Sequence, residues 1–184
     1  MKVLAISGSL RDDSFNTKLL RAAAELAPPG VGVELWNGLK AVPPFDEDDE
    51  GEQAPAGVVE LYDAIAGADA LLFATPEYNS SIPGQLKNAI DWASRPKATA
   101  PIRNKPSAVI GASTGMFGAV WAQAELRKVL ASAGARVVES ELSVPLAHTR
   151  FDADGRLTDE EARERLGEIV ASLVAVAERV PVAA

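Results

Sequence analysis

The stretch VLAISGSLRDDSFN, residues 3–16, decides the fold. It opens with four consecutive apolar residues, Val3 to Ile6, which is typical of a strand buried on both faces of a parallel sheet. A polar loop follows, and Ser14 or Asn16 can cap a helix whose apolar residues recur at helical spacing over residues 19–27. A buried strand, a polar loop and an amphipathic helix in this order predict an α/β protein.

The rest of the chain repeats this alternation. Further strands are expected at residues 31–35, 70–74, 108–111 and 136–144, and further helices at 58–66, 84–93 and 119–133. A capping box of Thr158 and Glu161 predicts a last helix that reaches about Val180. Five strands alternating with five helices predict a doubly wound five-stranded parallel sheet with helices on both faces and the flavodoxin-like strand order 2-1-3-4-5. We expect residues 1–184 to form one domain.

Composition excludes several kinds of site. The chain has no Cys, which excludes disulfides, Cys-ligated zinc, iron–sulfur clusters and a thiol nucleophile, and its one His, His148, excludes a multi-histidine metal site. The net charge of −8 argues against binding to nucleic acid or to an anionic membrane surface. Because no apolar run is long enough for a membrane span or a signal peptide, we expect a cytoplasmic protein. Because the chain has no Cys and a single His, we also expect no bound metal.

Three loops follow the first, third and fourth expected strands, and in a doubly wound sheet ligands bind at that edge. The first loop leads into a helix N-terminus, where free backbone N–H groups and the helix dipole favour an anion. Its hydroxyls (Ser9, Ser14), amide (Asn16) and guanidinium (Arg11) suit a phosphate monoester. The loop has one Gly and matches neither a dinucleotide fingerprint nor a Walker loop. An ordinary capped turn remains the alternative.

The second and third loops suit a planar ligand. Two prolines stiffen the second loop, residues 75–84, and Tyr78 offers an aromatic ring beside the amide of Asn79. The third loop, residues 112–118, contains two glycines that permit close backbone approach. Each loop alone could be a turn without a ligand, but three such loops at one sheet edge favour a single planar, phosphorylated ligand.

The strings GSLRDDSFN, PEYNSSIPGQLKNAIDW and STGMFG resemble the NAD(P)H-dependent FMN reductase family, which includes quinone, azo-dye and chromate reductases. The resemblance runs from the first strand to the last helix, with one departure: Ala119 stands where many members have a second glycine. It implies an FMN cofactor with NADPH or NADH as co-substrate. The implied FMN-binding residues are Ser9, Arg11, Ser14, Phe15 and Asn16 around the phosphate and ribityl chain, Pro76, Glu77, Tyr78 and Asn79 along the ring, and Ser113, Thr114 and Gly115 near its far edge.

The resemblance also implies a mechanism and an assembly. Hydride passes from NAD(P)H to the flavin and then, in a ping-pong sequence, to a small-molecule acceptor such as a flavin or a quinone. No protein side chain is then needed as an acid or base, so no catalytic residue is assigned. The family forms homodimers or homotetramers in which the second subunit helps to close the flavin pocket. Trp92 and Trp121 are either part of such an interface or part of the core.

Other interpretations remain to be weighed. A non-enzymatic flavodoxin-type electron carrier would share the fold, the FMN and the acidic surface, although the residue 76–92 segment resembles the reductases. A receiver-like signalling domain needs acidic residues where Ser7 and Thr75 stand, and is rejected. A hydrolase would need a G-x-S-x-G elbow, which the chain lacks, so His148 is interpreted as a surface or packing residue.

Overall fold

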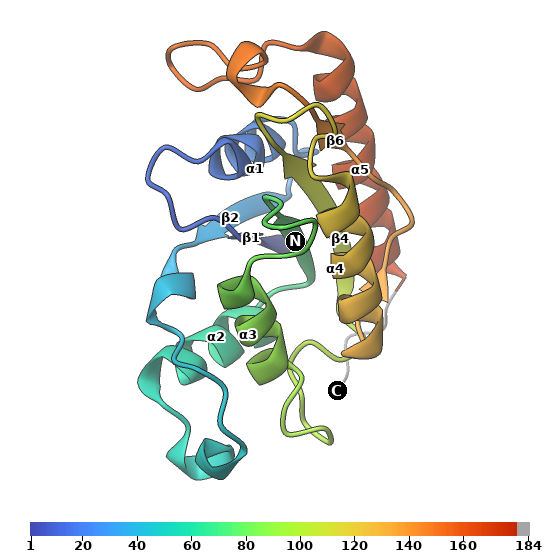
Figure 1. Ribbon diagram of the computed structural model, residues 1–184. Coiled ribbons are helices and arrows are strands. Elements are labelled where there is room, and N and C mark those ends of the chain that lie inside the picture. Colours follow the sequence, from blue (N-terminus) through green and yellow to red (C-terminus); the bar gives the residue numbers. More distant parts are fainter. Residues whose placement is uncertain (180–184) are drawn as a thin grey trace.

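The computed structural model describes residues 1–179 and consists of one sheet with helices on both faces (Figure 1). In chain order the elements are β1 (Lys2–Ser7), α1 (Phe15–Glu25), β2 (Gly32–Trp36), α2 (Ala56–Ala66), β3 (Ala70–Ala74), α3 (Gly84–Ala93), β4 (Pro106–Ala112), α4 (Val120–Ser132), β5 (Arg136–Val137), β6 (Ser143–Val144) and α5 (Glu160–Glu178). Short 3-10 helices occupy Gly38–Ala41, Glu47–Asp49, Gly51–Gln53 and Ala147–Thr149. None of the described helices combines the length and apolarity that crossing a bilayer requires.

The strand order is β2-β1-β3-β4-β5, and every pair is parallel, which confirms the flavodoxin-like doubly wound sheet. Ile6 lies beside Trp36 in β2 and beside Phe73 in β3. The carboxyl ends of β1, β2 and β3 therefore lie at one edge, and Ala74 pairs with Ile110 to bring the end of β4 there too. This register places the three loops in which the sequence analysis expects a ligand at the same edge.

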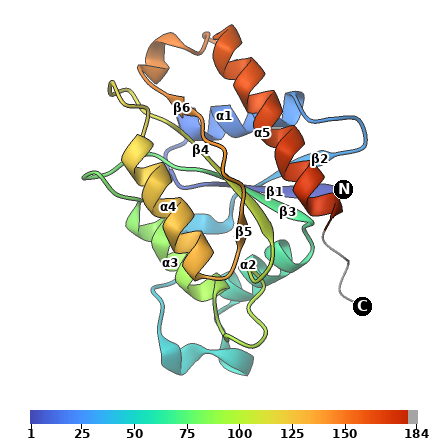
Figure 2. The ribbon, with the colours of Figure 1, turned by 90° about the vertical axis from the view of Figure 1, so that its right-hand side faces the viewer.

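Successive side chains of the central strands enter two separate cores. Leu4, Ile6 and Phe73 point into the core covered by α2, α3 and α4, whereas Val3 and Ala5 point into the core covered by α1 and α5. Figure 2 shows α1 and α5 on one side of the sheet and α2, α3 and α4 on the other. Because both faces are covered, the central strands are apolar throughout, as the run Val3 to Ile6 predicts.

The expected single strand at residues 136–144 is wrong in one respect. The structure splits it into β5 and β6, and β6 pairs with β4 through Gly111 and Ala112. Glu139 and Glu141, between the two short strands, are exposed charged residues at the sheet edge. Charged residues and short pairings at an edge limit strand addition by other chains.

The helix starts confirm one sequence interpretation and correct another. Of the two candidate caps of α1, Ser14 is the N-cap, and its Oγ accepts the N–H of Thr17 (3.3 Å). The capping box at Thr158 is wrong, because Asp159 caps α5 by accepting the N–H of Ala162 (2.9 Å) while the Thr158 hydroxyl donates to Arg150 O. The expected end of this helix at Val180 lies outside the described residues.

Candidate functional site

A cavity of about 160 Å³ lies where the three loops meet. It is lined by the predicted residues Ser9, Arg11, Ser14, Phe15, Asn16, Pro76, Glu77, Tyr78, Ser113 and Thr114, together with Ala112. Asn79 and Gly115, also predicted to bind FMN, are exposed and do not line it. The structure thus gathers most of the predicted set from three parts of the chain, and it adds Ala112, which sequence reasoning missed because alanine carries no chemical signal.

The first loop presents free donors at the N-terminus of α1. Among the described residues no acceptor takes the backbone N–H groups of Phe15 and Asn16, and no carboxylate lies at ion-pair distance from Arg11. Such a donor set at a positive helix end fits a phosphate monoester. The nearby carboxylate of Asp13 faces away into an ion pair with Lys18, and its hydrogen bond to that ammonium lowers the pKa of Asp13.

Asn16 joins the first loop to the end of β4. Its side chain is buried, its Nδ2 donates to Ala112 O (3.0 Å), and its Oδ1 accepts the Ala112 N–H (2.9 Å). The amide oxygen is therefore committed to the protein, and one Nδ2 hydrogen remains for a ligand. Asn16 thus sets the distance between the first and third loops.

Glu77 makes a contact that its sequence context does not reveal. Its Oε2 accepts the backbone N–H groups of Trp121 (3.1 Å) and Ala122 (3.2 Å) at the start of α4. The residue at the N-cap position of that helix is Ala119, which has no side-chain acceptor. A carboxylate at a helix N-terminus satisfies free donors and interacts favourably with the helix dipole. Glu77 therefore lines the cavity and also fixes the second loop to α4.

A tight turn follows Glu77. Tyr78 and Ser81 exchange backbone hydrogen bonds (3.0 and 3.1 Å) across Asn79 and Ser80, both of which have positive φ (54° and 60°). Two consecutive left-handed residues between paired backbones are typical of a type I′ turn, and Asn tolerates this conformation better than most residues. The turn leaves the Tyr78 ring 48% exposed at the rim of the cavity.

The third loop has a left-handed backbone at both Gly118 (φ 59°) and Ala119 (φ 66°). Ala119 stands where many members of the family have glycine, and glycine adopts this left-handed conformation without the steric cost that alanine bears. Gln123, fully buried on α4, donates from Nε2 to Gly118 O (3.2 Å) and Ser143 Oγ (2.8 Å). Sequence reasoning missed Gln123, although a polar residue in the apolar stripe with Leu126 and Leu130 was a readable signal.

The two tryptophans have different environments. Trp92 is fully buried, and its Nε1 donates to Pro43 O (2.9 Å), so of the two alternatives it is a core residue. Trp121 is 48% exposed beside the cavity and packs edge-on against Phe117, with ring centroids 4.8 Å apart. Met116 and Phe117 are also exposed, so these three residues form an apolar rim on the third loop and the start of α4, outside the cavity lining.

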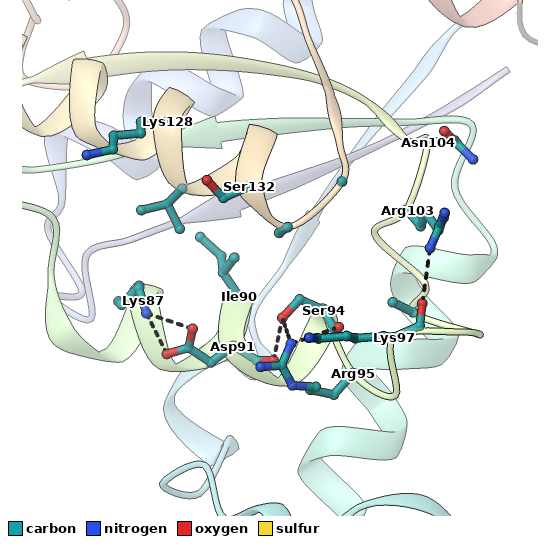
Figure 3. A pocket seen from close by; sticks show the side chains of 14 residues that line it. Lys87, Ile90, Asp91, Ser94, Arg95, Lys97, Arg103, Asn104, Lys128 and Ser132 are labelled. Atoms are coloured by element: carbon teal, nitrogen blue, oxygen red, sulfur yellow. Dashed lines mark hydrogen bonds and ion pairs between the residues drawn. The ribbon is translucent and has the colours of Figure 1, made fainter.

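A separate hollow of about 600 Å³ lies between α3 and α4 (Figure 3). Figure 3 shows Lys87 pointing to Asp91, with Nζ–oxygen distances of 2.6 and 2.8 Å. Asn104 and Gly134, which precede β4 and β5, also line this hollow. It therefore lies toward the amino edge of the sheet, opposite the edge at which doubly wound folds bind their ligands.

Comparison with known proteins agrees with this geometry. The model of the NADPH-dependent FMN reductase family matches residues 1–149. An NAD(P)H-dependent FMN reductase of Pseudomonas aeruginosa is 45% identical over 174 residues, which cover 94% of this chain and 93% of that protein. A 2-hydroxy-1,4-benzoquinone reductase of a Burkholderia species is 38% identical, with 90% of each chain covered.

Among solved structures, a flavoenzyme NAD(P)H:(acceptor) oxidoreductase from Paracoccus denitrificans superposes with a TM-score of 0.87 at 38% identity, covering 97% of each chain. These names describe oxidoreductases, which favours an enzyme over an electron carrier of the same fold. The order of the three loops, their meeting at the carboxyl edge of the sheet and these matches lead to one conclusion: the chain belongs to the NADPH-dependent FMN reductase family.

Proposed function

We propose that this chain binds FMN in the cavity between the three loops. The supporting observation is the set of unaccepted N–H groups at the start of α1 beside the Arg11 guanidinium, which suits the dianionic FMN phosphate. The second and third loops then flank the isoalloxazine ring, with Pro76 and Tyr78 on one side and Ser113 and Thr114 on the other. Asn79 and Gly115, adjacent to these residues, belong to the same proposed set.

FMN supplies the redox chemistry when bound, and the protein supplies binding, orientation and exclusion of water. The charged side chains lining the cavity support this division of roles. The Glu77 carboxylate is held by α4, and Arg11 lies at the phosphate end. Both charged side chains therefore have a binding or positioning role, and no residue is proposed as an acid or base.

The proposed reaction is transfer of hydride from NAD(P)H to a small acceptor, a flavin or a quinone. The names of the Pseudomonas and Burkholderia relatives support these two acceptor classes. The apolar rim of Met116, Phe117 and Trp121 offers a surface that a flat, weakly polar acceptor can approach. The same rim supports a homodimer or homotetramer, because exposed aromatic residues are enriched at interfaces.

Visible absorption tests the proposal. We expect the purified protein, or the protein after FMN addition, to show a flavin spectrum that bleaches when NADPH or NADH is added without oxygen and recovers when a benzoquinone is added. A flavin spectrum that stays unbleached with both nucleotides indicates the electron carrier instead. A protein that neither contains nor takes up FMN overturns the assignment of the cavity.

A further inference from the structure

A second hollow adjoins the first loop on the side away from the flavin cavity. Its volume is about 380 Å³, and it lies between the carboxyl ends of β1 and β2, the first turns of α1 and the 3-10 helix that follows β2. It shares Ser9 and Arg11 with the flavin cavity, so these two residues form the boundary between the two spaces.

Three cations from three different elements line this hollow: Arg11 from the first loop, Arg21 from α1 and Lys40 from the 3-10 helix. Among the side chains that the structure describes, no carboxylate lies at ion-pair distance from any of the three. Asp12 also lines the hollow, so its lining carries a net charge of about +2 in a chain whose net charge is −8. Uncompensated cations converging from separate elements favour a phosphate ligand.

The end of β2 adds a second observation. This chain has Trp36 and Asn37 at that point, and both line the hollow. Asn37 does not repel a phosphate as a carboxylate would, and the half-buried Trp36 adds an aromatic side chain to the lining.

We propose that this hollow binds the adenosine 2′-phosphate of NADPH, with Arg21 and Lys40 as the phosphate-binding residues. The proposal rests on the proposed function and deepens it, because it assigns the choice of co-substrate to residues outside the flavin cavity. It implies that the enzyme prefers NADPH to NADH. Arg11, at the boundary, serves the FMN phosphate and extends the same positive region.

The test uses the FMN-loaded protein. Isothermal titration with adenosine 2′-monophosphate is expected to show binding that is at least tenfold tighter than that of adenosine 5′-monophosphate. The variants Arg21→Ala and Lys40→Ala are each expected to weaken 2′-monophosphate binding and raise the KM for NADPH about tenfold, with the KM for NADH unchanged. Arg136→Ala, which removes an exposed cation at the opposite sheet edge, is the matched control and is expected to change neither.

The outcomes separate this proposal from the FMN assignment. Equal binding of the two monophosphates, or KM values for NADPH and NADH that rise together in the Arg21 and Lys40 variants, overturns the 2′-phosphate site while the flavin spectrum stays intact. If the protein oxidises neither nucleotide, the proposed function fails. The titration still tests the hollow in that case, because 2′-monophosphate binding that Arg21→Ala leaves unchanged also overturns the site.

Discussion

At the scale of single residues, the site depends on side chains that join one loop to another. Asn16 connects the first loop to the end of β4, and Glu77 connects the second loop to α4. Gln123 connects α4 to the third loop and to β6, and its Oε1 has no partner within the described part of the chain. Such contacts hold ligand-binding loops in one arrangement before the ligand arrives, which lowers the entropy lost on binding.

Arg11 is the residue whose removal tests the phosphate site most directly. We expect Arg11→Ala to weaken FMN binding about tenfold, or about 1.4 kcal/mol, because a charge-assisted contact to the phosphate is lost. The fold is expected to remain intact, since the Arg11 side chain is exposed and has no ion-pair partner among residues 1–179. Quenching of FMN fluorescence measures the affinity, and far-UV circular dichroism checks the fold. An affinity equal to that of the wild type contradicts the assignment.

At the scale of elements, α4 begins without a side-chain cap of its own and relies on Glu77. We expect Glu77→Ala to lower the free energy of unfolding by about 1 kcal/mol, as loss of an N-cap does, and the melting temperature by about 2–4 °C. It should also weaken FMN binding, because the second loop loses its attachment to α4. Thermal unfolding with and without FMN measures both effects.

Glu77→Gln is the matched control for this capping contact. The Gln side chain keeps an acceptor oxygen for Trp121 and Ala122 but loses the charge, so we expect it to retain much of the stability and the FMN affinity. An alanine variant as stable as the wild type, or a glutamine variant as damaged as the alanine variant, shows that the hydrogen bonds at the start of α4 do not carry the effect.

The third loop offers a pair of glycines for comparison. A Cβ at Gly118 would lie 2.8 Å from backbone atoms of Ser143 and Val144, and the residue has a φ of 59°. We therefore expect Gly118→Ala to destabilise the fold by about 2 kcal/mol or more and to weaken FMN binding. At Gly115 the nearest contact would be 3.5 Å, so Gly115→Ala is expected to leave stability unchanged. Equal melting temperatures for the two variants contradict this argument.

The elements also show how far the sequence can be interpreted. The strand Val3 to Ile6, a helix cap at Ser14 or Asn16 and the meeting of three loops were predictable, because each rests on a local pattern or on a general rule for parallel sheets. The cap that Glu77 provides to α4 was not, since its partners lie more than forty residues away. The division between β5 and β6 depends on which residues meet the sheet edge, which no local pattern specifies.

At the scale of the whole molecule, we propose that assembly of two or more chains completes the flavin cavity. Phe117 is 60% exposed beside the cavity, and we expect the protein to sediment at micromolar concentration as a dimer or larger species through this apolar rim. Phe117→Glu is expected to shift it toward the monomer and to weaken FMN binding, since a charge in an apolar interface is desolvated without a partner. Val59→Glu on α2 replaces an exposed apolar residue outside the rim and is expected to change neither property. A wild-type protein that sediments as a monomer shows that one chain alone forms the site.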